Sequence, residues 1–592
     1  MFKGFKGTFF LFLVILAFSY LVLSPSFSLA LFGDDWLAFF RFRQHVDPGS
    51  GQWNYLTYYL TPYGSQDILM GVLNKIYGLN STLYYLTSFS FRMLAAFSFY
   101  PLVYFLTKNK LSAFFAVLFF SLTVVGLDTT NWVFNMPTYA TISLFNISLY
   151  FFLLNREKPI LKTLLFSGIF YYFAYITTPI RMHGSLPLLL LLEAFWVLQV
   201  RDVKTIKKAA VRFGVMLLVF LIVRYTGHSM GPSNEVSERL SQGLQVDVTL
   251  LKQGRFDFLF YPILMFGSMI IPDIISPQFM VTATRSLLPL VMISFSVFSL
   301  ILVLMKKYIE ALSNKFFKII ILTSFLWTLF CLLIYKGNVS TLSVSGLFLL
   351  LLIGGYVMIL GTFLLIVFFK QKWLSTSIFL GLAWSILSFF FAWWWLPTSI
   401  FPTTYRYLIV SAAGVTIFLS SLISLSKNRS RQFALFFLLL PLILINIWIV
   451  RLFLNQSLSS HSQMVSNKVW NSLPVIPEIS KNREPFIFYF EGDGTNGAIL
   501  HDVITFGFPP HMALTYGLRD GDPIPVPMSD FREVASAVID GKPMPAYGYK
   551  VKPVDINRIY AFLLRDDNLI DVTKEARNKL EQFKKDYQQN SK

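Results

Sequence analysis

The stretch "GTFFLFLVILAFSYLVLSPSFSLALFGDDWLAFFRFRQH", residues 7–45, joins a long apolar run to two adjacent aspartates. Its first part, Gly7–Leu23, approaches the roughly 20 apolar residues that cross a bilayer as a helix. Lys3 and Lys6 precede this run and no small-residue cleavage site follows it, which predicts a retained membrane helix and not a removed signal peptide. Asp34 and Asp35 then place two carboxylates close to the membrane, where charge is costly.

Apolar runs of this kind recur along the chain. Of its 592 residues 55% are hydrophobic and only 14% are charged, whereas soluble proteins carry about a quarter charged residues. We therefore expect an α-helical polytopic membrane protein with about 13 transmembrane helices. A single cysteine, Cys331, excludes an intrachain disulfide and a cysteine metal site. The expected spans are Gly7–Leu23, Phe89–Leu106, Leu111–Gly126, Tyr139–Leu154, Leu161–Thr177, Leu186–Val200, Phe213–Gly227, Leu287–Met305, Phe316–Tyr335, Leu342–Phe369, Leu374–Trp395, Leu408–Leu425 and Phe433–Leu454.

The basic residues predict the topology. With the N-terminus in the cytoplasm, every second loop is short and basic: "TKNK", "NREKPILK", "RDVKTIKKAAVR", "KKYIEALSNKFFK", "KQK" and "SKNRSR". The opposite loops are poor in Lys and Arg, as the positive-inside rule requires. We expect an integral protein of a bacterial inner membrane or a plasma membrane. The net charge of +19 lies mainly on the cytoplasmic rim, which indicates contact with membrane lipids and no nucleic-acid partner.

Two domains are expected, a transmembrane catalytic domain over residues 1–464 and a small α/β domain over residues 465–592 on the extracytoplasmic side. The tail changes to prolines, glycines and mixed charge. In it "PFIFYF" and "RIYAFLL" are typical of strands, and "SDFREVASAVID" and "VTKEARNKLEQFKKD" of helices. Within the outer segment Ser229–Arg285, "FDFLFYPILMFGSMIIP" is interrupted by Pro and Gly, so it is expected in the interface or as a re-entrant segment.

The run after the aspartates, "WLAFFRFRQH", predicts an interfacial helix in the first outer loop, with Gly33 in the turn before it. One interpretation is that Asp34 or Asp35 only caps this helix by accepting main-chain hydrogen bonds. The other is that one carboxylate faces a cavity and acts in catalysis, and both can hold at once. The side chains expected at the membrane face are Trp36, Phe39, Phe40 and Phe42, with Arg41 and Arg43 reaching toward water or phosphate.

The aspartate pair, the number of spans, the basic loops and the outer tail resemble the GT-C glycosyltransferases, such as protein O-mannosyltransferases and lipid A aminoarabinose transferases. The motif "FGDDW" carries the resemblance, with weaker support from "NWVFNMPTYATISLFNISLYFFLL", "TTPIRMHGSLPLLLLLE" and "PTTYRYLIVSAAG". The family pair is often Asp-Glu, and here it is Asp-Asp. The resemblance implies an inverting transfer of a sugar from a polyprenyl phosphate to a protein, glycan or lipid acceptor outside the membrane, without a cofactor. The relatives generally do without a bound metal, and a divalent cation shared by Asp34 and Asp35 stays open.

This chemistry needs a base beside the acceptor and cations beside the departing phosphate. An aspartate next to a second aspartate at a low-dielectric face has a raised proton affinity, which suits a base, and the pair would titrate together. Asp34 is favoured because it matches the first position of the family pair. A guanidinium holds phosphate in a fork geometry. The expected donor-phosphate residues are Arg406, Tyr405, Arg181, Arg92 and Arg41, and the expected acceptor or cavity residues are His183, Trp36 and His45.

Two other classes stay open. A surface-glycan polymerase or ligase of another fold usually places its key arginines and histidines in a large late outer loop, and the outer loops after Arg285 are short. A non-enzymatic lipid or sugar transporter predicts charges in mid-span, to which Glu193 and Arg224 come nearest. The chain also shows no internal repeat of the kind from which many transporters are built.

Overall fold

The computed structural model describes residues 2–31, 33–46, 55–61, 63–227, 245–254, 256–270, 287–309, 312–336, 345–393, 406–458, 473, 476–481, 486–492, 507–518, 524–539, 554–565 and 568–590. Within these residues ten helices are long and apolar enough to cross a membrane, so the chain is a polytopic helical membrane protein. These candidate spans are Gly7–Ser28, Ser81–Thr107, Val133–Glu157, Pro179–Val200, Pro289–Tyr308, Asn314–Ile334, Phe348–Phe368, Lys372–Phe391, Arg406–Ile423 and Arg429–Leu458.

Three of the runs expected to span do not appear among these ten. The run that begins at Leu111 forms only α6 (Lys110–Leu122), of 13 residues, because the chain leaves the helix at Thr123. Helix α9 (Leu161–Thr177) has 17 residues. Helix α11 (Val203–Gly227) is long, but it carries several lysines and an arginine in its first turns and Arg224 near its end, more charge than a membrane span usually holds.

The other helices of this part of the chain follow the same order as the apolar runs. They are α1 (Phe2–Leu23), α2 (Asp34–His45), α3 (Tyr55–Tyr59), α4 (Gly64–Tyr77), α5 (Ser81–Thr107), α7 (Leu127–Asn131), α8 (Pro137–Glu157), α10 (Ser185–Val200), α13 (Asp257–Ile270), α15 (Leu287–Tyr308), α16 (Asn314–Lys336), α17 (Ser345–Phe368), α18 (Lys372–Trp393), α19 (Ile409–Ile423) and α20 (Arg429–Leu458). Short 3-10 helices are η1 (Ser24–Ser28), η3 (Val133–Asn135), η4 (Pro179–Met182) and η7 (Arg406–Leu408).

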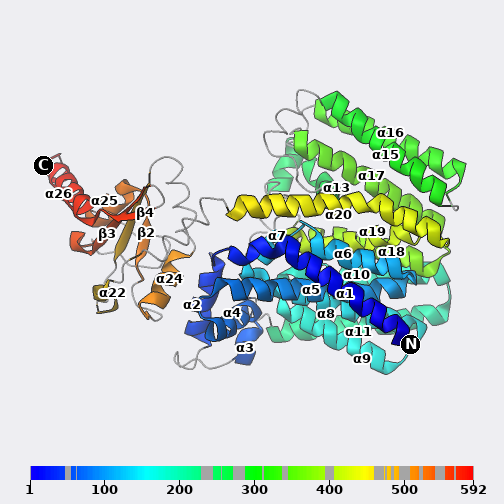
Figure 1. The fold of residues 1–592 in the computed structure, drawn as a ribbon, viewed down its shortest axis with the longest axis horizontal. Helices are drawn as coiled ribbons and strands as arrows, with labels where there is room; N and C mark the ends of the chain where they lie inside the picture. The colour runs from blue at the N-terminus through cyan, green and yellow to red at the C-terminus, as the bar shows by residue number, and fades with distance from the viewer. Residues whose placement is uncertain are drawn as a thin grey trace.

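The two ends of the helical bundle differ (Figure 1). Helices α2, α3 and α4 lie at one end, and the C-terminal sheet lies beyond them. The N-terminus lies at the opposite end, and α20 runs along the bundle and leads to the tail. The first aspartates and the tail are therefore at the same end of the bundle.

The interrupted stretch before Ile270 forms helix α13, and its glycine lets it pack closely against α17. A side chain at Gly267 would place its Cβ 1.9 Å from the carbonyl oxygen of Leu350, and one at Gly354 would lie 1.9 Å from that of Ile263. The two glycines let α13 and α17 approach backbone to backbone, the usual arrangement where small residues meet between membrane helices. Helix α13 thus packs into the bundle, and side chains from Leu264 to Ile270 are buried there.

The tail contains a four-stranded sheet in the order β2-β1-β3-β4. Strand β1 (Ile487–Gly492) is parallel to β2 (Val526–Met528) and to β3 (Ile559–Arg565), while β4 (Asn568–Asp571) is antiparallel to β3. The strands expected in "PFIFYF" and "RIYAFLL" are confirmed. The tail helices are α22 (Pro477–Lys481), α24 (Phe508–Thr515), α25 (Phe531–Ile539) and α26 (Thr573–Asn590), with η8 (Ile556–Arg558) before β3.

Alternation along the strands sorts the tail core into two layers. Phe488 and Phe490 of β1 point to the face that packs with Met512 of α24. Ile487 and Tyr489 point to the other face, which packs with α25 and α26 through side chains such as Val534 and Leu580. The period of two in a strand produces this separation. Helix α24 is therefore the layer of the tail that can meet the bundle.

Candidate active site

Helix α2 begins in a turn that requires glycine. Gly33 precedes the helix with φ of +57° and ψ of −118°, a combination that residues with a Cβ rarely adopt. A Cβ at this position would also lie 3.2 Å from the indole ring of Trp132. This turn places Asp34 and Asp35 in the first turn of α2, where the positive end of the helix dipole stabilises their negative charge.

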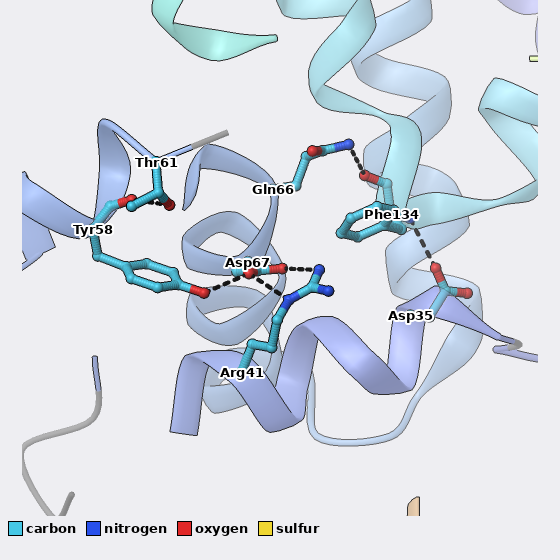
Figure 2. Close-up of polar contacts among 7 residues, drawn as sticks. All are labelled: Asp35, Arg41, Tyr58, Thr61, Gln66, Asp67 and Phe134. Carbon is cyan, nitrogen blue, oxygen red and sulfur yellow. Dashed lines mark hydrogen bonds and ion pairs between the residues drawn. The ribbon is translucent and has the colours of Figure 1, made fainter. Parts of the chain in front are cut away.

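Asp35 is fully buried and fixes the turn to a distant segment. Its Oδ1 accepts a hydrogen bond of 2.8 Å from the main-chain N–H of Phe134 in η3 (Figure 2). The interpretation that an aspartate caps α2 is therefore corrected: the N-cap is Gly33, no side chain caps this helix, and Asp35 serves the backbone of η3. Position 35 therefore joins two parts of the chain that are 99 residues apart.

Asp34 lies beside Asp35 and is partly exposed, and its surroundings have two opposite effects on its pKa. Burial raises the pKa of the Asp34 carboxyl, and the positive charges of Arg406 and Arg41 lower it. A carboxylate whose pKa is raised by desolvation and lowered by two guanidinium groups can both accept a proton and release it. Of the pair, Asp34 is thus the one with a free face and a tuned proton affinity.

Arg406 is held by neighbours from three segments. Its main-chain oxygen accepts hydrogen bonds from Arg181 Nη1 at 2.7 Å and from Thr129 Oγ1 at 3.4 Å. Its guanidinium carbon lies 4.0 Å from the ring centroid of Trp132. Such a cation–π contact fixes the plane of a guanidinium, and Nη2 of Arg406 also donates to the hydroxyl of Tyr407 at 3.4 Å. Tyr405, expected to share the phosphate with Arg406, lies outside the described residues.

Arg181 belongs to the same cluster, but its side chain hydrogen-bonds other parts of the protein. Besides Arg406 it donates to Asn135 Oδ1 at 3.0 Å, and it is almost fully buried. Because Asn135 follows Phe134 in η3, Arg181 connects the main chain at Arg406 to the segment that holds Asp35. Arg181 therefore positions the cluster from behind.

Arg41 is held by a carboxylate that the sequence analysis did not select. Its Nε and Nη2 donate to the two oxygens of Asp67 at 2.8 and 2.7 Å, and Tyr58 donates to Asp67 at 2.7 Å (Figure 2). The Asp67 side chain is fully buried, while 23% of the Arg41 side chain is exposed. A bidentate pair of this kind orients the guanidinium. The spacing of Asp67 from Arg41 gives no helix or strand signal that would have revealed the pair.

Asp128 is the second carboxylate that sequence reasoning did not select. It lies in the short helix α7, next to Thr129, which hydrogen-bonds the main chain of Arg406. Burial raises the pKa of Asp128 to about 7, and the charge of Arg406 opposes this rise. Near neutral pH this carboxyl can therefore change the charge that Arg406 experiences.

The aromatic side chains of α2 face the protein, which corrects their expected membrane location. Trp36, Phe39 and Phe42 are 5%, 2% and 3% exposed. Phe40 packs against the tail core that contains Phe488. The apolar face of α2 is covered by α4 and by the tail, a contact that no sequence pattern could distinguish from a lipid surface.

The tail meets α2 at Trp36. Its ring centroid lies 4.4 Å from that of His511 in α24, at an interplanar angle of 79°. Burial lowers the pKa of His511 to about 4, so this histidine is neutral at physiological pH. Trp36, expected in the acceptor cavity, is thus part of the contact between α2 and the tail.

The other expected site residues are engaged elsewhere. His45 stacks on Tyr58 with centroids 5.5 Å apart, and His183 stacks on Tyr175 at 6.4 Å. Arg92 is fully buried in α5 and donates to Ser121 O at 3.1 Å, to Thr130 Oγ1 at 2.9 Å and to Thr123 O. A phosphate-binding role for Arg92 stays a prediction.

The fold and this cluster define a class: a polytopic helical membrane protein whose first non-membrane helix carries two aspartates beside arginines. No protein family and no curated protein matches the chain. Among the residues described, no group of three or more His, Cys, Asp or Glu side chains could hold a metal ion.

Proposed function

We propose that the chain is a membrane glycosyltransferase that moves a sugar from a polyprenyl-phosphate donor to an acceptor at the α2 end of the bundle, on the extracytoplasmic side. The observation that carries this proposal is the position of Asp34, at the first turn of α2, under the charges of both Arg406 and Arg41. A base and phosphate-binding cations are the two chemical elements that such a transfer requires.

The reaction follows from these groups. The acceptor hydroxyl gives its proton to Asp34 while its oxygen forms a bond to the anomeric carbon of the sugar. The bond from that carbon to the phosphate oxygen breaks, and polyprenyl phosphate leaves with the electron pair. Attack opposite to the leaving group inverts the anomeric configuration. The guanidinium of Arg406 stabilises the charge that develops on the departing phosphate.

The arrangement of the tail gives it a part in this proposal. Helix α24 covers Trp36, two residues from Asp34, and excludes water from one side of α2. A site that is partly dry strengthens each electrostatic contact within it. We assign residues 465–592 to an extracytoplasmic domain that helps to select the acceptor.

The test is transfer of a labelled sugar from defined polyprenyl-phosphate sugars by the purified full-length protein in lipid nanodiscs. We expect release of polyprenyl phosphate that depends on an added acceptor and on Asp34. Donor sugars that are never consumed, across hexoses, pentoses and a range of acceptors, would refute the proposal.

A transporter is the second candidate, and one observation favours it. Glu193 of α10 is buried and paired with Arg212 at 2.7 Å and with Arg156 at 3.1 Å. Charged groups inside helical membrane proteins often mark transport pathways. Uptake of labelled lipid-linked sugar into sealed vesicles, lost in Glu193→Gln and kept in Asp34→Asn, would favour this class instead.

A further inference from the structure

The bundle has a second feature at the end away from α2, which the proposed function does not use. A cavity of about 1010 Å³ opens between three loops that are far apart in the sequence. Five of its lining side chains are cationic, and no acidic residue is among those that line it: Lys108, Lys110, Lys372, Lys427 and Arg429. We name it the basic cavity.

Hydrogen bonds tie two of the three loops of the basic cavity to each other. Ser112 of α6 and Ser424 after α19 share a hydrogen bond of 2.6 Å. Gln432 of α20 donates to the main-chain oxygen of Ser426 at 2.8 Å. The loops before α6 and α20 are therefore tied to each other, so the backbone that carries their cations need not be ordered at the time of binding.

Helix ends add to the positive potential of the basic cavity. Lys110, Lys372 and Arg429 are the first residues of α6, α18 and α20, so each brings the positive end of a helix dipole with it. Asn109 lines the cavity and is 9% exposed. Its Oδ1 caps α6, and its Nδ2 has no hydrogen-bond partner in the part of the chain that the structure describes. An anionic oxygen would satisfy this donor.

The apolar side chains that line the basic cavity favour a lipid over a free anion. Leu11 of α1 and Phe433 of α20 line it, and they are 43% and 41% exposed on helices that are candidate spans. Phe114 of α6 adds a further apolar side chain. A ligand that fills this cavity therefore meets cations at one part and hydrocarbon at another, which matches a phospholipid with an anionic head group.

We propose that the basic cavity is a specific binding site for one anionic phospholipid, whose phosphate lies among the lysines and whose acyl chains lie along α1, α6 and α20. This proposal does not depend on the glycosyltransferase assignment. Lys108 is also 3.7 Å from Glu157 and is therefore partly neutralised, which leaves Lys110 and Lys427 as the better residues to change.

The experiment uses the purified full-length protein and native mass spectrometry, titrated with phosphatidylglycerol, with phosphatidylcholine and with inorganic phosphate. Each lysine near an anionic lipid contributes about a fivefold change in affinity. We expect one phosphatidylglycerol to bind in preference to phosphatidylcholine, and Lys110→Gln with Lys427→Gln to weaken its binding about 25-fold. Lys110→Arg with Lys427→Arg should keep the binding and show that the exchanged positions are tolerated.

The matched control is Lys158→Gln with Lys162→Gln, two exposed lysines of a neighbouring basic loop that do not line the cavity. It should bind phosphatidylglycerol as the unchanged protein does. Equal losses in the two glutamine variants would mean diffuse surface attraction and would overturn the proposal. Equal binding of both lipids, or displacement of phosphatidylglycerol by inorganic phosphate at the same concentration, would overturn it as well.

Discussion

The two ends of the helical bundle differ in how their buried carboxylates are paired with cations. At the α2 end the carboxylates of Asp35 and Asp67 are buried and burial raises the pKa of Asp128, while Arg41 is partly exposed and Arg406 stacks on an aromatic ring. At the other end the buried carboxylate of Glu193 has two arginines, and the remaining cations line an open cavity. The α2 end therefore holds carboxylates with few cations around them, and the other end holds an excess of cations.

This difference teaches where chemistry can occur. A carboxyl that is buried with too few cations holds its proton more tightly, and its pKa rises into the range that a base needs. The carboxylate of Glu193 instead forms ion pairs with two arginines. The α2 end is accordingly the end at which we place catalysis, and the basic end is the one at which we place a lipid.

The strongest test of the comparison is Asp34→Asn. The amide keeps the shape of the side chain but cannot accept the proton, so turnover should fall by about 10²–10⁴-fold while donor binding survives. The measurement is single-turnover sugar transfer together with donor affinity. Asp35→Asn is the matched control, because its amide oxygen can still accept the hydrogen bond from Phe134, and it should lose much less.

If both variants keep nearly full turnover, the aspartate pair has only a structural role and the α2 end has no base. If Asp35→Asn is the more damaging of the two while its fold is retained, the roles that we assign within the pair are reversed.

Stability should separate the two ends as well. Arg41→Met leaves Asp67 buried without a cation, and because Arg41 is partly exposed we expect a loss of about 2–3 kcal/mol, less than for a fully buried pair. Arg212→Met leaves Glu193 with Arg156 at 3.1 Å, so the loss should be about half as large. Equilibrium unfolding in mixed micelles measures both. A larger loss for Arg212→Met would contradict this account of how the two ends hold charge.

Arg406→Ala tests the cation at the α2 end. A charge-assisted hydrogen bond contributes about 1.5–3 kcal/mol, so donor KM should rise about 10–100-fold. The main-chain contact with Arg181 is retained in this variant, so the fold should survive. Arg451→Ala is the control, since Arg451 donates to main-chain oxygens of α1, at Leu21 and Val22, and should leave the donor KM unchanged. A KM that does not move in Arg406→Ala would remove Arg406 from the donor site.

Local patterns predicted much of this architecture. Ten of the expected spans correspond to candidate spans, and α2 begins at the aspartate pair. Apolar length and the choice of residues at turns are properties of neighbouring residues, which a sequence displays directly. The strands of the tail were recognisable for the same reason.

The partners within the site were not predictable, because they are set by packing between distant segments. The hydrogen bond from Phe134 to Asp35 and the pair of Arg41 with Asp67 depend on how η3 and α4 lie against α2. The aromatic run of α2 has the same composition whether lipid or protein covers it. Its burial under the tail follows from the contact of α24 with Trp36, which is a tertiary property.

Asp128→Asn gives the smallest expected effect and tests how proton binding reaches Arg406. Since burial raises the pKa of Asp128 to about 7, the carboxyl is neutral below that pH and ionised above it. Above about pH 7 its negative charge competes with the donor phosphate for Arg406, so donor KM should rise by a few-fold as pH increases. Asparagine stays neutral and should abolish this rise.

The same group gives a linked effect on stability whose sign can be stated. The folded protein binds a proton on Asp128 that the unfolded chain releases above about pH 4, so stability falls as pH rises from there to about 7 and then levels off. Asp128→Asn should flatten that part of the unfolding profile. If the variant removes the slope in stability but leaves the pH dependence of KM, then Asp128 has the raised pKa described above but its charge does not act on the donor. Helix α7 would then affect Arg406 only through the hydrogen bond of Thr129 to its main chain.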